Sequence, residues 1–203
     1  MDINRFNQQL HFITEIDRLK MVLRQTLLMD QSRRENSAEH SWHLALLAMI
    51  LVEYAPEPID LLRVMKMALL HDIVEIDAGD VFCYDIAANI GKAEREQRAA
   101  DRIFGLLPSD QAQELRQLWD EFETQDTADA KFAAALDRLQ PFWHNLNTEG
   151  GTWRIHGINQ DQAMKRIGLV KTAIPELWPW VEQAIATAVQ NGLLQPSEAN
   201  TEP

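Results

Sequence analysis

The sequence has a single cysteine, Cys83, among 203 residues, so no intramolecular disulfide can form. Scarce cysteine is typical of proteins that work in a reducing compartment. Long apolar runs are also missing, because the longest, Leu44 to Val52, has nine residues and a membrane-spanning helix needs about 20. The first ten residues, MDINRFNQQL, lack the basic and apolar segments of a secretory signal. We therefore expect a cytoplasmic protein without a membrane segment.

Basic residues are outnumbered. The chain has 19 Lys and Arg against 31 Asp and Glu, a formal net charge of −12 at pH 7. A surface of this sign repels the phosphate backbone of DNA and RNA, whose binding proteins usually carry a basic patch. We expect no nucleic-acid partner. A small phosphorylated substrate is compatible with this charge, because a bound cation and one or two arginines reverse the field inside a pocket.

Sustained alternation of polar and apolar residues is absent, and apolar residues instead recur three and four apart, as in amphipathic helices. Asn36 followed by Glu39 predicts a capping box at the start of one helix. We expect an all-α, single-domain fold over residues 1–192 and a polar, disordered tail over 193–203. The expected helices cover 4–29, 36–54, 58–76, 92–106, 109–123, 126–147, 159–173 and 176–191, with a connection at 80–91 and a loop at 148–158.

The segment MALLHDIVEID places His71 and Asp72 inside an apolar helix. An aspartate is seldom buried unless it is paired or binds a metal. Neighbouring helical residues point about 100° apart, so His71 and Asp72 can both reach one ion at the helix surface. Glu75 follows on the same stripe of the helix. Three functional side chains therefore gather on one helix face.

Two further candidate ligands come from other predicted helices. His40 lies in the first turn of the helix that begins after Asn36, and Asp137 lies in the apolar segment KFAAALDRL. Two imidazoles and two carboxylates suit Mn²⁺, Co²⁺, Fe²⁺, Mg²⁺ or Zn²⁺. Water bound to such an ion supplies a hydroxide nucleophile near neutral pH. Spacing alone leaves an alternative open, in which the histidines are core residues and Asp137 belongs to a surface ion pair.

The order H…HD…D resembles the HD-domain phosphohydrolases. The segments RRENSAEHSW, ALLHDIVEIDAGD, LWDEFE and LDRLQPF resemble the subgroup of small HD hydrolases that includes the 5′-deoxynucleotidases, over roughly residues 16–170. The resemblance implies an HD-domain helical fold with a divalent metal between central helices. It places the metal ligands at His40, His71, Asp72 and Asp137.

The same resemblance assigns catalytic roles to Glu75 and Asp80. Glu75 is expected to transfer a proton to or from the reacting atoms, and Asp80 is expected to orient the attacking water. Arg24 resembles a family arginine that contacts the substrate phosphate, a role suited to a planar fork of donors. In deoxynucleotidases of this subgroup a tryptophan follows that arginine, whereas Gln25 follows it here. The preference for a deoxyribose sugar is therefore left open.

Two further residues are expected near the substrate. Arg33 occupies the basic position of RRENSAEH, and Glu121 in LWDEFE resembles a family acid beside the site, although Glu123 would serve as well. The predicted reaction is hydrolysis of a nucleoside 5′-monophosphate. The alternatives are phosphodiester or nucleotide pyrophosphate hydrolysis, and a non-catalytic helical module that binds a metal. A di-iron oxygenase is disfavoured, because it would need histidines between residues 73 and 136, where there are none.

A homodimer is also expected. The resemblance implies it, and helix-rich chains with scattered tryptophans often bury leftover apolar surface in a two-fold contact. The sequence does not choose between the first helix and the connection at 80–91 as the contact.

Overall fold

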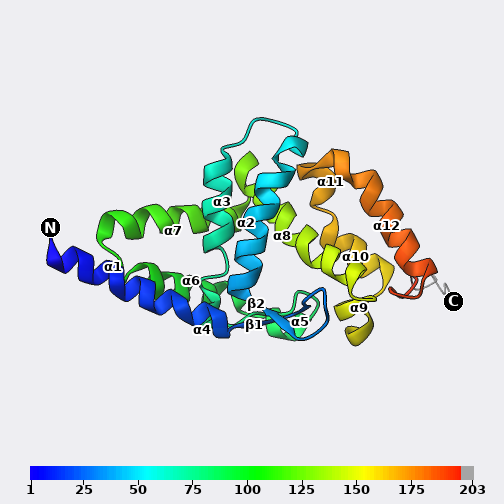
Figure 1. Cartoon of the computed structure of the whole chain (residues 1–203), viewed down its shortest axis with the longest axis horizontal. Coiled ribbons are helices and arrows are strands. Elements are labelled where there is room, and N and C mark those ends of the chain that lie inside the picture. Colours follow the sequence, from blue (N-terminus) through cyan, green and yellow to red (C-terminus); the bar gives the residue numbers. More distant parts are fainter. Residues whose placement is uncertain (198–203) are drawn as a thin grey trace.

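The computed structural model describes residues 1–197 and is helical apart from one two-stranded antiparallel sheet (Figure 1). The expected helical, single-domain fold is therefore confirmed. The longer helices are α1 (Ile3–Ile16), α2 (Ser37–Leu51), α3 (Leu61–Leu70), α6 (Lys92–Phe104), α7 (Ser109–Thr124), α8 (Ala128–Asn147), α10 (Gln160–Ile167) and α12 (Trp178–Gln190). The shorter elements are η1 (Asp17–Met21), β1 (Leu23–Leu27), β2 (Arg34–Asn36), η2 (Val52–Tyr54), α4 (Glu75–Ala78), α5 (Ile86–Asn89), α9 (Gly151–His156), α11 (Val170–Ala173) and η3 (Pro175–Leu177).

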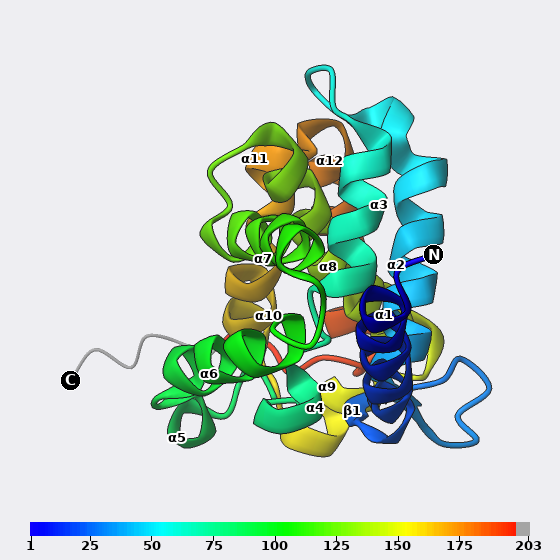
Figure 2. The ribbon, with the colours of Figure 1, turned by 90° about the vertical axis from the view of Figure 1, so that its left-hand side faces the viewer.

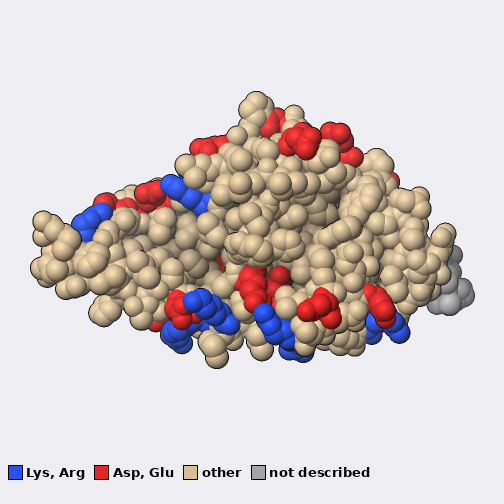
Figure 3. All heavy atoms as spheres, viewed as in Figure 1, with Lys and Arg blue, Asp and Glu red and all other residues tan. Residues whose placement is uncertain are grey.

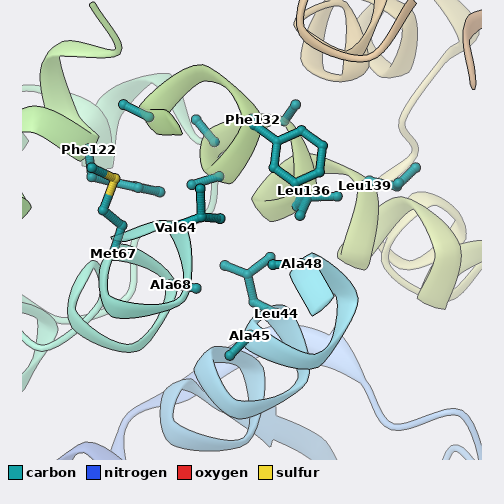
Figure 4. Packing of buried hydrophobic residues seen from close by; sticks show 14 of the residues in the cluster. Leu44, Ala45, Ala48, Val64, Met67, Ala68, Phe122, Phe132, Leu136 and Leu139 are labelled. Atoms are coloured by element: carbon teal, nitrogen blue, oxygen red, sulfur yellow. The ribbon is translucent and has the colours of Figure 1, made fainter. Parts of the chain in front are cut away.

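The core lies where α2, α3 and α8 pack against one another, with α7 alongside (Figures 1 and 2). Leu44 of α2, Met67 of α3 and Leu136 of α8 are fully buried there, and their side chains are shown in Figure 4. Burying one such side chain contributes about 1.5–3 kcal/mol to the stability of the fold. This packing fixes α2 and α8, which carry His40 and Asp137, and α3, whose end is followed by His71 and Asp72.

The helix expected over 4–29 ends early. It is α1 followed by the 3-10 turn η1, and Leu23–Leu27 forms β1, which pairs antiparallel with Arg34–Asn36. The apolar spacing of three and four continues into Leu23 and Leu27. Backbone hydrogen bonding to β2 is nevertheless more favourable there than one more helical turn. The pairs Leu23 with Asn36 and Leu27 with Arg34 enclose a register shift, so β1 bulges between them.

The capping box at the start of α2 is confirmed. The Glu39 backbone N–H donates to Asn36 Oδ1 at 2.9 Å, and the Asn36 N–H donates to Glu39 Oε2 at 3.1 Å. The helix expected over 58–76 differs, because it begins at Leu61 and ends at Leu70. The indole N–H of Trp119 in α7 donates to the His71 carbonyl at 3.1 Å, which satisfies an acceptor at the helix end.

Two other segments differ from the expectation. The loop at 148–158 contains α9, which lies between the left-handed glycines Gly150 (φ 88°) and Gly157 (φ 63°). The disordered tail was expected from residue 193, but Leu194 is buried and the backbone of Gln195 bonds to residues 158 and 160. The remainder of the tail, residues 198–203, lies outside the described residues. Within residues 1–197, no helix combines the length and apolar character needed to cross a membrane.

Candidate metal centre

Four candidate ligands meet at one end of the core. His40 comes from the first turn of α2, His71 and Asp72 follow the end of α3, and Asp137 comes from α8. Asp137 Oδ1 lies 3.0 Å from His40 Nε2 and 3.6 Å from His71 Nε2. Asp72 Oδ1 lies 3.1 Å from His71 Nε2, and Asp72 Oδ2 lies 4.0 Å from His40 Nε2. Ligand atoms of His40, His71 and Asp137 therefore lie within 4.8 Å of one another, and Asp72 lies at the edge of this group with its Oδ2 bonded to Arg24.

The hydrogen bonding of His71 leaves a ligand atom free. Its Nδ1 lies 2.9 Å from the Ala68 carbonyl oxygen, which can only accept, so this nitrogen carries the proton. Its Nε2 is buried and makes no hydrogen bond within residues 1–197. A buried lone pair without a hydrogen-bond partner costs free energy unless a bound group from outside the polypeptide interacts with it. A divalent cation fits this requirement.

The titration behaviour of the cluster also favours a cation. Burial disfavours the charged form of His71, but the carboxylates of Asp72 and Asp137 outweigh it and raise the pKa of His71 to about 9. Burial and the nearby Arg24 lower the pKa of His40 to about 4. Without a metal, the two carboxylates therefore favour a proton on the lone pair of His71 Nε2, and a divalent cation would provide the same compensation in its place.

Arg24 reaches the cluster from β1. Its Nη1 donates to Asp72 Oδ2 at 2.6 Å, and its Nε lies 3.7 Å from Glu35 Oε2. The side chain is only 11% exposed, so the interaction is protected from solvent screening. Arg24 is thus held against a candidate metal ligand, at the position that the bulge in β1 gives it.

Glu75 and Asp80 lie beside the ligands. Glu75 is the first residue of α4, is buried, and accepts a hydrogen bond from Ser37 Oγ at 2.7 Å. Burial and the neighbouring Asp72 raise its pKa well above the ordinary value of 4.5. Asp80 follows Gly79, whose φ of 75° turns the chain after α4, and burial likewise raises the pKa of Asp80. Both acids can hold a proton at a higher pH than an exposed carboxylic acid.

The cluster opens into a cavity of about 220 Å³. The cavity wall combines acids, bases and aromatic rings, a mixture that suits a charged substrate with an apolar part. Its acids are Asp72, Glu75, Asp80 and Asp137; its bases are Arg24, Lys92, Arg138 and Arg166; its aromatic residues are Phe82, Tyr84, Phe142 and Trp153.

The structure does not bring Arg33 and Glu121 to this cavity. Arg33 extends from the hairpin and forms a two-pronged ion pair with Glu39, at 2.8 and 2.6 Å. Glu121 pairs with Arg63 and accepts a hydrogen bond from Thr127 at 2.6 Å. Neither side chain lines the cavity, so the expectation that they contact substrate has no support in the geometry.

Several residues of the site escaped the sequence argument. Arg138 and Arg166 line the cavity, and Arg166 Nη2 lies 3.4 Å from Asp137 Oδ2. Glu35 and Gln140 are buried behind His40. Only their positions in the sequence could have indicated these two residues. Glu35 lies within the segment RRENSAEH, and Gln140 follows Asp137 by three residues, on the same helix face. Glu123, the alternative to Glu121, is absent from the cavity wall, although burial and the nearby Glu96 raise its pKa to about 7.

Comparison with known proteins places this site in a family. The HD domain model matches residues 16–178. The 5′-deoxynucleotidase HDDC2 of Homo sapiens is 33% identical over 132 residues, which cover 64% of this chain and 63% of the human protein. This chain therefore matches less than two thirds of the length of that relative.

Solved structures agree. The crystal structure of a predicted metal-dependent phosphohydrolase from Magnetospirillum magnetotacticum MS-1 is 52% identical, with a TM-score of 0.91, and the match covers 95% of this chain and 96% of that one. An HD-domain phosphohydrolase from Listeria innocua is 16% identical with a TM-score of 0.56, covering 89% and 84% of the two chains, and shares the fold. The family match spans all four candidate ligands, and the chain belongs to the HD domain family.

Proposed function

We propose that this chain is a metal-dependent phosphohydrolase that removes phosphate from a nucleoside 5′-monophosphate. The observation that carries the proposal is the buried, unpartnered Nε2 of His71, which faces two carboxylates beside an acid of raised pKa, Glu75. The relatives named 5′-deoxynucleotidase and metal-dependent phosphohydrolase support the same reaction class.

His40, His71, Asp72 and Asp137 would hold the cation. The mixed nitrogen and oxygen set suits Mn²⁺, Co²⁺, Fe²⁺, Mg²⁺ or Zn²⁺. When bound, such an ion polarises the phosphoryl group and lowers the pKa of a water molecule. Arg24 keeps Asp72 in place through its hydrogen bond, so the carboxylate is oriented before the ion arrives.

Glu75 and Asp80 would manage protons. Hydrolysis forms a bond between phosphorus and the water oxygen and breaks the ester bond to the alcohol. The protonated carboxyl of Glu75 donates its proton to the departing alcohol oxygen, and Ser37 holds it in position. Asp80 accepts a hydrogen bond from the attacking water and aligns it with phosphorus. One proton of this water stays on the phosphate, and the other passes to solvent, from which the Glu75 carboxylate is protonated again. The raised pKa of Glu75 keeps this acid protonated at a higher pH than an exposed glutamic acid.

Arg138 and Arg166 would bind the phosphate oxygens. Arg138 forms no ion pair within residues 1–197 and lies in the cavity wall near Arg166, whose positive charge, after burial, lowers the pKa of Arg138. Two neighbouring guanidinium groups repel each other unless an anion lies between them. A phosphate dianion next to Asp137 would relieve this repulsion and be gripped by planar donors.

The rest of the substrate would occupy the aromatic part of the cavity. The rings of Phe142 and Trp153 lie 5.4 Å apart in an edge-to-face arrangement, and Phe82 and Tyr84 line the same cavity. Such surfaces suit a base and a sugar. Gln25 also lines the cavity, so its amide offers a donor and an acceptor to the sugar hydroxyls.

The test is phosphate release from a panel of substrates. The panel contains deoxyribo- and ribonucleoside 5′- and 3′-monophosphates and bis(p-nitrophenyl) phosphate, each with Mn²⁺ or Co²⁺ and with a chelator. We expect phosphate release from a 5′-monophosphate, no release after chelation, and no p-nitrophenol from the diester, whose hydrolysis would liberate p-nitrophenol rather than phosphate. Asp137→Asn should abolish turnover, whereas Asp129→Asn, on the same helix but bonded to the Asp60 backbone, should not. Turnover that survives chelation would refute the metal mechanism.

We also propose that the chain forms a homodimer through the outer face of α2. Trp42, Leu46, Met49 and Ile50 are exposed there, and α2 has no charged residue after Glu39. Figure 3 shows an area without charged side chains at the centre of this face of the molecule, directly above a cluster of acidic side chains. A contiguous exposed apolar patch is typical of an interface between copies. Light scattering should give twice the monomer mass, and Ile50→Glu should give the monomer mass. A monomer mass for the unaltered chain at all concentrations would refute the dimer.

A further inference from the structure

Gln140 is the centre of a buried polar network behind the proposed metal site. It lies on α8, one turn after Asp137, and is completely buried. Its Oε1 lies 3.1 Å from His40 Nδ1. Its Nε2 lies 2.7 Å from Glu35 Oε1, 3.0 Å from His144 Nε2 and 3.3 Å from His43 Nδ1. The amide thus connects His40 to three side chains that do not line the cavity.

The side chains of His144 and Glu35 determine the orientation of the Gln140 amide. His144 Nδ1 lies 2.8 Å from the Leu27 carbonyl oxygen, an acceptor, so this nitrogen carries the proton and His144 Nε2 has a bare lone pair. That lone pair requires a donor, and the NH₂ of Gln140 at 3.0 Å lies closer to it than His43 Nδ1 at 3.4 Å. The Glu35 carboxylate requires a donor at the same place. The shortest contacts therefore place the NH₂ of Gln140 between Glu35 and His144 and its amide oxygen against His40.

This orientation of the amide determines which ring nitrogen of His40 carries a proton. An amide oxygen only accepts, so His40 Nδ1 carries a proton and donates it to Gln140. The lone pair of neutral His40 is then on Nε2, which faces Asp137 Oδ1 at 3.0 Å. Two lone pairs at this separation repel each other unless a cation lies between them. The network thus presents His40 Nε2 in the form that a metal ion requires.

We propose that Gln140 is a positioning residue that holds His40 in its Nδ1–H form and so determines the affinity of the metal site. This inference rests on the proposed metal site but not on the proposed substrate. The chain of contacts runs from the Leu27 carbonyl of β1 through His144 and Gln140 to His40. Loss of an outer partner of a ligating histidine typically weakens metal binding by about 10- to 100-fold.

An alternative is that Glu35, His43 and His144 bind a second ion, because their ligand atoms lie within 4.8 Å of one another. The Gln140 nitrogen already lies among them. Turning the amide over would place its oxygen there, but the NH₂ would then face His40 Nδ1 and force the proton onto Nε2. A second ion would thus disable the first site, and we expect one ion per chain.

The test is titration of the metal-free protein with Co²⁺, measuring stoichiometry, affinity and the visible spectrum. Gln140→Leu removes the acceptor and should weaken binding about 10- to 100-fold. Leu139→Ala is the matched control, because it disturbs the same helix and the core without touching the network. Its melting temperature should fall, and its Co²⁺ affinity should match that of the unaltered protein.

Gln140→Glu keeps an oxygen against His40, while its carboxyl shares a proton with Glu35. We expect it to retain most of the affinity. Equal affinity for Gln140→Leu and the unaltered protein would overturn the proposal, as would a stoichiometry of two ions. If Gln140→Leu does not fold, Gln140→Glu decides the question, because a loss of about tenfold or more contradicts the acceptor role. Failure of the phosphate-release panel with these affinities as expected would refute the substrate alone.

Discussion

Glu75→Gln separates proton transfer from metal binding. Glutamine has the shape of a protonated glutamic acid and can still accept from Ser37 Oγ, which lies 2.7 Å from the carboxyl, so the fold and the ligands should be preserved. The variant cannot donate an acidic proton. General acid catalysis contributes about 10²- to 10⁴-fold in rate, equivalent to about 3 to 5 kcal/mol in the barrier. We expect kcat to fall by this factor with unchanged metal content.

The assay is phosphate release under saturating substrate, combined with elemental analysis of the purified protein. Asp77→Asn is the control, since Asp77 lies on the same short helix but pairs with Arg102 outside the cavity. The control should keep its activity. Loss of metal from Glu75→Gln would show that Glu75 is a ligand, and a kcat close to that of the unaltered protein would refute its role as the acid.

The same variant has a measurable pH dependence in the metal-free protein. The pKa of Glu75 is raised in the folded state, so its stabilising contribution is complete below its ordinary value of 4.5 and is lost as the pH rises through the folded pKa. Urea denaturation should therefore show that Glu75→Gln becomes more stable relative to the unaltered protein as the pH rises above 4.5. A difference that does not change with pH would contradict the raised pKa.

Three further predictions concern single contacts. Asp72→Ala should abolish metal binding and activity, because it removes a proposed ligand and leaves Arg24 buried without its partner; retained metal by elemental analysis would contradict this. Arg33→Gln should leave kcat/KM unchanged and the stability almost unchanged, because its exposed ion pair with Glu39 lies outside the cavity and is screened by solvent; a raised KM would indicate that Arg33 binds substrate. Trp119→Phe should lower the free energy of unfolding by about 1 to 3 kcal/mol, because the His71 carbonyl loses its donor; an unchanged urea midpoint would mean that water replaces the indole.

The sequence identified most of the fold because helix periodicity is a local signal. The capping box at Asn36 and the breaks between helices follow from residues a few positions apart. The helix over 4–29 was wrong beyond residue 21, because β1 is stabilised by pairing with residues about ten positions away. Local spacing carries no information about such a partner.

The candidate ligands were found because their residue types and order resemble a family. Glu35 and Gln140 were missed, because a glutamate and a glutamine in helical or strand segments are usually exposed. These two side chains are 105 positions apart in the sequence, and only the fold shows that Gln140 Nε2 and Glu35 Oε1 lie 2.7 Å apart. Arg33 and Glu121 remain predictions that the cavity geometry does not support, since proximity to a motif in sequence does not place a side chain in the cavity.

The bulge in β1 means that the length of this strand matters more than its composition. Between the two paired positions, β1 runs from Leu23 to Leu27 and β2 only from Arg34 to Asn36, so β1 has two more residues than its partner strand. Arg24 lies within this bulged segment. Substitutions that keep the side chains of similar size should be tolerated along the strand except at Arg24, which donates a hydrogen bond to Asp72. Removing two residues would regularise the ladder and strengthen the pairing, but it would withdraw Arg24 from Asp72 and the Leu27 carbonyl from His144 together. The irregular strand is therefore required for both the Arg24 contact with Asp72 and the Leu27 contact with His144. Insertions should be tolerated best in the turn at residues 28–33.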